Sequence, residues 1–334
     1  MTQYSARLKP NFSSPTRTFS CIPFVYLMRK GGALVERSLG MFARTLGMRT
    51  AFALGWRRQN LKRLFKLTIS IAYFLCIWPL ETIGRLLGVV RNPRCVVLYY
   101  HAATVSQRSR FSRQMDLLTR WATPVPASFS GPFEPGCRYA AITFDDGFLS
   151  VVENAVPELS KRGIPCTVFI ISDFLGRVPS WAEEYSDGGE PERFVTLEEL
   201  VKMPSDLVVI GSHTMTHPKL TAVSAKEAAR ELVESRRQLE KWLGMEVKLF
   251  SFPFGDFSQS LIGLCREAGY SRVFTTLPTQ AFACPDEYVT GRVPVEPSDW
   301  DIEFLLKLFG TYRWLPYAFS LKRAIRSRLG LSDI

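Results

Sequence analysis

The chain lacks the cysteine patterns that build disulfide frameworks and cysteine metal clusters. It has seven cysteines in 334 residues, an odd number, and no two of them form a C-x-x-C pair. Several of them lie within apolar runs that are typical of a buried core. This usage argues against a disulfide-rich scaffold and a zinc-ribbon site, and it favours a reducing compartment.

Apolar runs long enough to cross a membrane are also lacking. The charge-free run Leu67–Leu80 has 14 residues, whereas a spanning helix needs ~20. Extending it to Val90 would bury Glu81 and Arg85, which is costly in lipid. We therefore favour an interfacial segment or a re-entrant hairpin, and a true span within 67–90 stays open as an alternative. A cleavable signal peptide is not indicated, because the first apolar patch is short and follows a long polar lead.

Acidic residues are scarce only in the N-terminal part. Residues 1–95 contain 16 Lys and Arg but two acids, whereas the remainder has 26 Lys and Arg and 29 Asp and Glu. Leu and Phe are interleaved with these basic residues, which favours an anionic membrane surface over a nucleic acid. The alternative is that ordinary amphipathic helices pack on the domain. We predict a membrane-associating segment over 1–94, on the cytoplasmic face of a bacterial inner membrane, and no nucleic-acid partner.

From Cys95 onward, short β-rich runs alternate with helical stretches, which is typical of βα units. This pattern predicts an α/β domain over 95–300, followed by a basic amphipathic tail over 301–334 that could make a second membrane contact. A long loop is expected over 172–194. The predicted strands are 95–100, 139–144, 166–171, 207–210, 249–252, 272–276 and 291–295, and the main predicted helices are 150–161, 224–243 and 259–268.

Unusual polar groups follow the ends of several predicted strands. His101 follows the first strand, Asp145 and Asp146 the second, His213 the fourth and Gly255 the fifth. In parallel α/β proteins the loops at the carboxyl ends of the strands assemble the active site. We therefore expect these residues to converge.

Two carboxylates and two histidines in these loops suggest a metal site. Asp145 and Asp146 precede Gly147, so the backbone can turn and aim both acids into one cavity, where a cation would relieve their repulsion. His213 and His217 are four residues apart and are two of only three histidines in the chain. Two imidazoles and one carboxylate leave coordination positions open, as in catalytic zinc sites.

The motifs T-F-D-D-G, H-T-x-x-H and F-S-F-P-F-G, in this order, resemble those of the polysaccharide deacetylase family, also called NodB-homology or carbohydrate esterase family 4. The resemblance covers about residues 95–300. It implies a distorted (β/α) barrel, here of about seven strands, with a basic helical segment before it. It also implies removal of an N-acetyl or similar acyl group from an amino sugar in a polysaccharide or lipid-linked glycan.

The resemblance assigns roles to particular residues. Asp145 corresponds to the general base, and Asp146, His213 and His217 correspond to ligands of a divalent metal, with zinc favoured over cobalt, nickel or manganese. Phe254 corresponds to the residue whose backbone N–H binds the oxyanion.

The chain departs from the fuller family pattern. Phe250 stands where many members have an arginine that braces the base, and no histidine follows His217 to supply a late Leu-x-His acid. Arg292-Val-Pro294 fits the Arg-x-Pro of shorter variants. We therefore predict that Arg292 braces Asp145, and that His101 or protonated Asp145 is the general acid. For His101 a buried structural role is an equal alternative.

Three rival functions stay open on sequence grounds. The same fold could hold a catalytically weak or inactive glycan-binding protein at the membrane. The protein could be chiefly a membrane scaffold. A glycosidase fits poorly, because adjacent acids cannot straddle a glycosidic bond and the histidines would have no role.

Overall fold

One parallel sheet organises the described part of the chain. This computed structural model describes residues 58–86, 94–180, 191–284 and 286–328. The strands pair in parallel in the order β8-β7-β6-β5-β4-β3-β1-β9, and β2 pairs with β3 beside this path. The bounds are β1 (Arg94–Tyr100), β2 (Thr123–Pro124), β3 (Arg138–Phe144), β4 (Cys166–Ile170), β5 (Val208–Ser212), β6 (Leu249–Ser251), β7 (Arg272–Thr275), β8 (Val289–Gly291) and β9 (Val293–Pro294).

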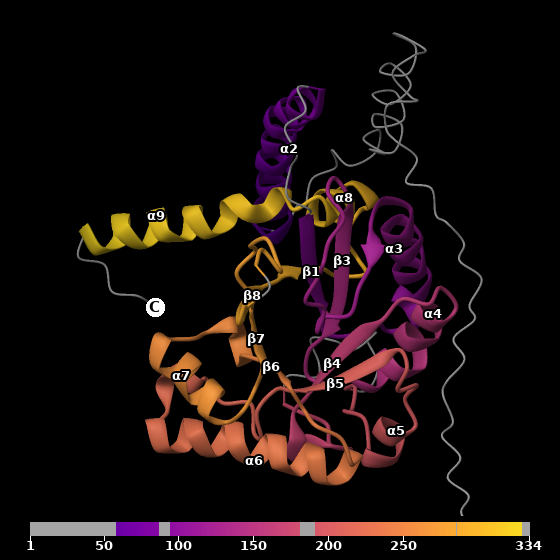
Figure 1. The fold of residues 1–334 in the computed structure, drawn as a ribbon, viewed down its shortest axis with the longest axis vertical. Helices are drawn as coiled ribbons and strands as arrows, with labels where there is room; N and C mark the ends of the chain where they lie inside the picture. Colours follow the sequence, from indigo (N-terminus) through magenta and orange to yellow (C-terminus); the bar gives the residue numbers. More distant parts are fainter. Residues whose placement is uncertain (1–57, 87–93, 181–190, 285, 329–334) are drawn as a thin grey trace, which may run out of the picture. The chain divides into compact units, whose positions relative to one another are not determined.

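The two edge strands of this sheet are neighbours in the sequence. β8 pairs with β7 and β9 pairs with β1, and only Arg292 separates β8 from β9. One short segment therefore connects both edges and nearly closes the sheet into a barrel (Figure 1). This confirms the predicted α/β barrel. The strand expected over 291–295 is instead two short strands, because the chain changes partners at Arg292.

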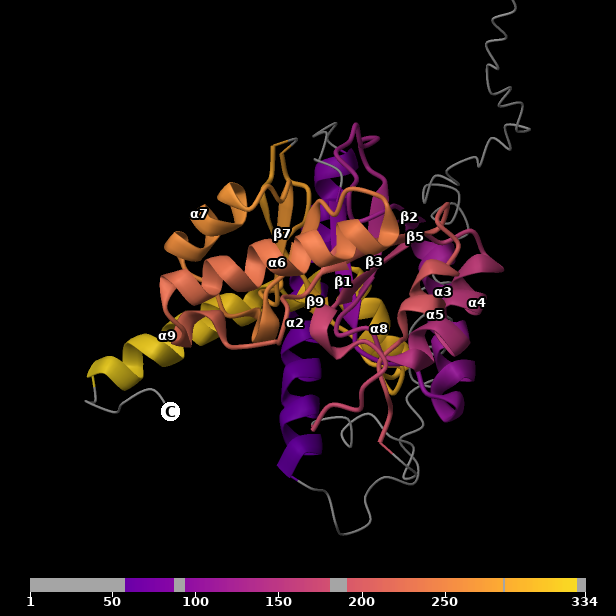
Figure 2. The same cartoon turned by 90° about the horizontal axis from the view of Figure 1, so that it is seen from below.

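Helices return the chain between the strands. Figures 1 and 2 show α3, α4 and α5 along one side of the sheet and α6 and α7 along another. The helices are α2 (Arg58–Leu86), α3 (Arg108–Trp121), α4 (Val156–Ser160), α5 (Leu197–Val201), α6 (Ala225–Leu243), α7 (Gln259–Glu267), α8 (Asp301–Leu308) and α9 (Leu315–Arg328). Short turns are Val105–Gln107, Ser172–Phe174, Leu220–Ala222, Pro253–Gly255 and Thr311–Trp314, and a π-helical turn, Val151–Ala155, precedes α4.

Local sequence sets both ends of α6. The Ser224 side chain accepts a hydrogen bond from the backbone N–H of Glu227, which caps the first turn. Gly244 adopts a left-handed conformation with φ 66°, which ends the helix at little steric cost. The expected helix over 224–243 is thereby confirmed.

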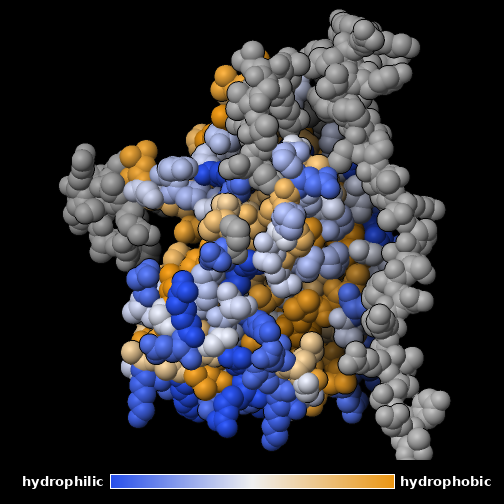
Figure 3. Space-filling view, viewed as in Figure 1, coloured by the Kyte–Doolittle hydropathy of each residue, from blue (hydrophilic) through white to orange (hydrophobic). Residues whose placement is uncertain are grey.

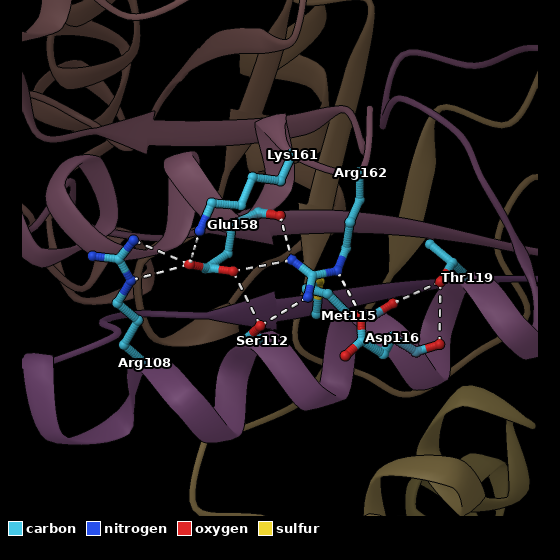
Figure 4. Close-up of polar contacts among 8 residues, drawn as sticks. All are labelled: Arg108, Ser112, Met115, Asp116, Thr119, Glu158, Lys161 and Arg162. Carbon is cyan, nitrogen blue, oxygen red and sulfur yellow. Dashed lines mark hydrogen bonds and ion pairs between the residues drawn. The ribbon is translucent and has the colours of Figure 1, made fainter.

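A buried carboxylate joins α3 to α4 (Figure 4). Glu158 accepts hydrogen bonds from Arg108 and Lys161 through Oε1, and from Ser112 and Arg162 through Oε2. The hydrogen bond from Lys161 acts most strongly on the pKa of Glu158, and with Arg162 and Arg108 it outweighs burial and lowers the pKa to about 2. This cluster holds the helix that follows the Asp145-Asp146 turn.

The apolar run 67–80 lies in the continuous helix α2, which has Pro79 inside it. The expected re-entrant hairpin is therefore wrong: a proline removes one backbone donor, and this helix continues past it. Its window Arg63–Leu80 is long and apolar enough to cross a membrane by length and composition alone. The expected segment before residue 58 lies outside the described residues, as do residues 181–190 of the expected long loop.

One face of α2 packs against the end of the domain. Leu67 is buried, and Ser70 accepts a hydrogen bond from Trp314 Nε1 at 2.9 Å. Arg63 pairs with Glu303 of α8 at 2.6 Å. α8 lies within the segment expected to be a tail, yet it contributes buried side chains to the same core as the barrel: Phe304, Leu306 and Leu308.

Candidate active site

The predicted functional residues lie at the carboxyl ends of their strands. Asp145 and Asp146 follow β3, His101 follows β1, and His213 follows β5. The Asp145 N–H donates to Tyr100 O at 2.9 Å, and the His213 N–H donates to Ile170 O at 2.8 Å. These bonds extend the parallel pairing by one residue, so the side chains emerge at a common edge.

Asp146, His213 and His217 form one compact group. Their candidate ligand atoms all lie within 4.8 Å of one another. Asp146 Oδ1 is 3.4 Å from His213 Nε2 and 3.5 Å from His217 Nε2. Two ligands of one tetrahedral ion, bound at ~2.0–2.1 Å, would lie about 3.4 Å apart. The observed spacing therefore suits a shared cation.

The donor set also fits a metal in its chemistry. Asp146 Oδ1 is buried and has no hydrogen-bond partner, which is costly unless a cation or another donor meets it. His213 Nδ1 lies 2.7 Å from the Ser251 carbonyl oxygen, so it carries the proton and leaves Nε2 free to act as a ligand. Burial is the largest cause that lowers the pKa of His217 to about 4, and a neutral ring is what a metal ligand requires.

An unusual turn aims the two adjacent acids. Asp146 has φ 70° and Gly147 has φ 85°, so the strand ends in consecutive left-handed residues. A Cβ added to Gly147 would lie 2.6 Å from the Ile170 Cδ1 atom. A side chain at this φ would be strained and would have to displace the Ile170 side chain, which explains the glycine in Asp145-Asp146-Gly147.

Arg292 lies directly against Asp145. Its two terminal nitrogens donate to Asp145 Oδ1 and Oδ2, each at 2.7 Å, which is the two-pronged geometry of strong arginine–carboxylate pairs. It also donates to Thr143 Oγ1 and Ser251 Oγ. The guanidinium is fully buried beside the rings of three aromatic residues: Tyr99, Phe169 and Phe274. The predicted contact between Arg292 and Asp145 is therefore present.

The Arg292 contact governs the ionisation of Asp145. Burial alone would raise the pKa of Asp145, but the charge of Arg292, followed by His213, the Arg292 hydrogen bonds and His101, lowers it to about 2. Asp145 is thus ionised at neutral pH, as a general base must be. Phe250, at the position of the family arginine, packs in the core against Phe252 and Tyr270.

His101 and Phe254 lie at the margin of the metal group. His101 is partly exposed, and its charge is close enough to lower the pKa of both Asp145 and Asp146. Phe254 has φ 59° and exposes 65% of its surface. Its ring centroid is 4.8 Å from that of His217, so the Pro253–Gly255 turn borders the site.

Glu231 is a site residue that the sequence did not reveal. It lies on α6, yet its side chain is buried and accepts three hydrogen bonds from Met215 and Thr216. Both donors lie between His213 and His217. In the sequence, Glu231 is one of several acids on an amphipathic helix. Only its position on the same helix face as Leu232 and Ser235, which are buried, distinguishes it from surface glutamates.

The fold and site together define a class: a nearly closed parallel α/β barrel with a candidate catalytic metal centre beside an arginine-braced aspartate. Residues 134–273 match the model of the polysaccharide deacetylase family. The resemblance to the polysaccharide deacetylase (NodB-homology) family that the motifs predicted is thereby confirmed over these residues.

Several known proteins are similar to this chain. YxkH of Bacillus subtilis is 24% identical over 212 residues, which cover 60% of this chain and 71% of YxkH. The peptidoglycan-N-acetylglucosamine deacetylase of Bacillus cereus is 22% identical over 48% of this chain and about half, 51%, of its own length. The structure of IcaB from Ammonifex degensii superposes with a TM-score of 0.55 at 26% identity, covering 64% of this chain and 97% of IcaB.

Proposed function

We propose that the protein is a divalent-metal-dependent N-deacetylase that acts on an acylated amino sugar within a glycan. The observation that carries this proposal is the juxtaposition of two groups at one edge of the barrel. Asp146, His213 and His217 offer ligand atoms within 4.8 Å of one another. The adjacent Asp145 is held by Arg292 and is not needed as a ligand. The family match and the named activities of the relatives support the same reaction.

Asp146, His213 and His217 would hold the metal ion. Imidazole nitrogen with one carboxylate oxygen suits zinc first, and also cobalt, nickel or manganese. A divalent ion in such a site lowers the pKa of water and polarises an acyl carbonyl. Three protein ligands leave room for water and substrate.

The chain's own residues would divide the remaining chemistry. Asp145 would take a proton from the attacking water, and Arg292 would hold both carboxylate oxygens in place during the transfer. The backbone N–H of Phe254 would stabilise the developing oxyanion. His101 would donate the proton that the leaving amine needs. Asp145 is the less suitable donor, because Arg292 favours its ionised form.

Acetate release from N-acetylglucosamine oligomers tests this proposal directly. We expect the full chain loaded with zinc to release acetate, and Asp145→Asn to abolish release while still binding zinc. The His213→Ala variant should lose both zinc binding and acetate release. Asp206→Asn, at an exposed acid outside the site, is the matched control. Zinc binding and glycan binding without acetate release would instead favour the inactive glycan-binding alternative.

For the substrate, we propose an N-acylated amino sugar in a cell-envelope polysaccharide or a lipid-linked glycan. Relatives are named as deacetylases of peptidoglycan N-acetylglucosamine, N-acetylmuramic acid and chitin. A screen of acetate release over free, peptidoglycan-derived and lipid-linked glycans would rank these classes. Release from none of them would overturn this assignment.

We also propose that α2 lies in an anionic membrane surface, at the cytoplasmic face that the cysteine usage favours. The helix is apolar on two faces: Leu67 faces the domain, whereas Leu75, Leu80 and Ile83 are 52–64% exposed. Figure 3 shows apolar surface on the projecting part of α2 and hydrophilic surface along α6. The pairing of Arg63 with buried Glu303 favours an interfacial position over a span that begins at Arg63.

Flotation with lipid vesicles tests this membrane proposal. We expect the full chain to float with phosphatidylglycerol vesicles and not with phosphatidylcholine vesicles, and to be released by alkaline carbonate. The triple variant Leu75→Ser, Leu80→Ser, Ile83→Ser should lose flotation and keep its fold. Val201→Ser, at an exposed apolar residue of α5, is the control. Retention by carbonate-washed membranes would indicate a span.

A further inference from the structure

The loop that carries both candidate histidine ligands is strained. Thr214 has φ 69° and His217 has φ 61°, so two non-glycine residues within four positions adopt the left-handed conformation. Such a conformation is unfavourable for a non-glycine residue and persists only where surrounding contacts hold it. Within the loop, Thr214 Oγ1 accepts a hydrogen bond from the His217 N–H at 3.0 Å. The remaining support must come from outside the loop.

Glu231 of α6 supplies that support. Its Oε2 accepts the backbone N–H groups of Met215 and Thr216 at 2.8 and 2.9 Å, and its Oε1 accepts the Thr216 hydroxyl at 2.7 Å. Its side chain is 1% exposed. Among the described residues, no Lys or Arg pairs with Glu231. Its burial is therefore compensated by the ligand loop itself.

We propose that Glu231 is a positioning residue of the metal centre, which sets the spacing of His213 and His217 and adds negative charge near the cation. On the opposite side, the backbone of Ser172 and Asp173 donates to the carbonyls of Thr214 and Met215. The loop is thus held from the Ser172–Phe174 turn that follows β4 and from α6, and of these two contacts only the one from α6 carries charge. This inference rests on the proposed metal-dependent function.

Two substitutions separate geometry from charge. Glu231→Gln can keep all three hydrogen bonds, because its amide oxygen can accept both N–H groups while its NH₂ donates to the Thr216 hydroxyl. Glu231→Ala removes the bonds and the charge. Residues that orient metal ligands typically contribute 10–100-fold in metal affinity. We expect zinc affinity to fall about 100-fold in Glu231→Ala and about tenfold or less in Glu231→Gln.

Two measurements test this role without requiring turnover. One is zinc affinity, measured by competition with a chromophoric chelator, and the other is the visible absorption of the cobalt-loaded protein. Glu231→Ala should also alter the cobalt spectrum, whereas Glu231→Gln should nearly preserve it. Glu227→Ala, one turn earlier on α6, where the side chain is 43% exposed, should change neither. If Glu231→Ala does not fold, Thr216→Ala, which removes one of the three bonds, should lower zinc affinity by a smaller factor.

The outcomes distinguish this inference from the proposed function. A wild-type chain that binds no zinc would overturn the metal site itself. Wild-type binding together with unchanged zinc affinity and cobalt spectrum in Glu231→Ala and Glu231→Gln would overturn only the role of Glu231. Reduced thermal stability with unchanged zinc affinity would likewise contradict positioning, because it would assign Glu231 to packing alone.

Discussion

Two buried aspartates in this protein have pKa values shifted in opposite directions, although burial raises the pKa of both. Asp145, in the candidate active site, has a pKa lowered to about 2. Asp299, beside α8, has a pKa raised to about 6, because burial and the nearby Glu303 outweigh the opposing charge of Lys307. Both aspartates contact a cationic side chain at 2.6–2.7 Å.

The difference lies in how the cations are shared. Among the described acidic residues, Arg292 pairs with Asp145 alone, and it binds both of its oxygens. Lys307 divides its charge between Asp299 and Glu303, and Arg63 of α2 also approaches both acids. A guanidinium that pairs with one carboxylate thus keeps that carboxylate ionised although it is buried. A cation shared between two acids does not, and the cluster around Lys307 mainly connects α2 to the domain.

Removing the Arg292 guanidinium should have the largest effect on stability and on activity. Arg292→Met leaves Asp145 buried and unpaired, which typically costs ~3–5 kcal/mol of stability. Misplacing the base should also lower kcat about 100-fold or more, with a smaller change in KM. Urea unfolding and acetate-release kinetics would measure the two effects. Arg292→Lys keeps the charge but cannot bind both oxygens, so wild-type kcat in that variant would contradict the bracing role.

Removing the Lys307 ammonium should lower stability by less and leave zinc binding unchanged. Lys307→Met leaves Asp299 and Glu303 with only Arg63, so we expect a loss near the low end of ~3–5 kcal/mol. Zinc affinity should not change, because the cluster has no contact with the metal group. Urea unfolding and zinc titration on one preparation would check this, and a loss of zinc affinity would show that the two clusters are coupled.

The raised pKa of Asp299 should be visible in the pH dependence of the free energy of unfolding. The folded-state pKa of Asp299 is raised from 3.8 to about 6, so the folded state binds the extra proton between these values. Its contribution to stability therefore falls as pH rises from about 4 to about 6. Comparing urea unfolding of the wild type and Asp299→Asn over this range should show a slope that the variant lacks. Identical slopes would place the pKa of Asp299 near its ordinary value.

Glu158 should show the opposite and smaller trend. Its pKa is lowered from 4.5 to about 2, so its stabilising contribution is complete above about pH 4.5 and is lost as pH falls towards 2. Glu158→Gln should destabilise the protein by about 1–3 kcal/mol at pH 7 and by less near pH 3. An equal effect at both pH values would argue against an ionised Glu158.

Much of the site could be predicted because its residues occupy short motifs at strand ends. Parallel topology brings such ends together, so Asp146, His213 and His217 converge although they are far apart in sequence. Arg292 could be predicted from the missing arginine at Phe250 and the Arg-x-Pro motif.

The remaining features depend on tertiary contacts that leave little local pattern. The break between β8 and β9 arises because the two sheet edges meet at Arg292, and the flanking Gly291 and Pro294 do not by themselves indicate a change of strand partner. α2 continues past Pro79 although proline favours a break in a helix, and the burial of α8 depends on its packing against α2 and α3. The role proposed for Glu231 depends on its contacts with the loop that carries His213 and His217, whereas its own helix resembles any amphipathic helix.

Equilibrium dialysis of the purified full chain against zinc tests the central claim most directly. We predict one tightly bound ion per chain in the wild type and in Asp145→Asn, and none in His213→Ala or Asp146→Ala. A wild-type chain without zinc, or undiminished binding in His213→Ala and Asp146→Ala, would contradict a metal centre built from Asp146, His213 and His217.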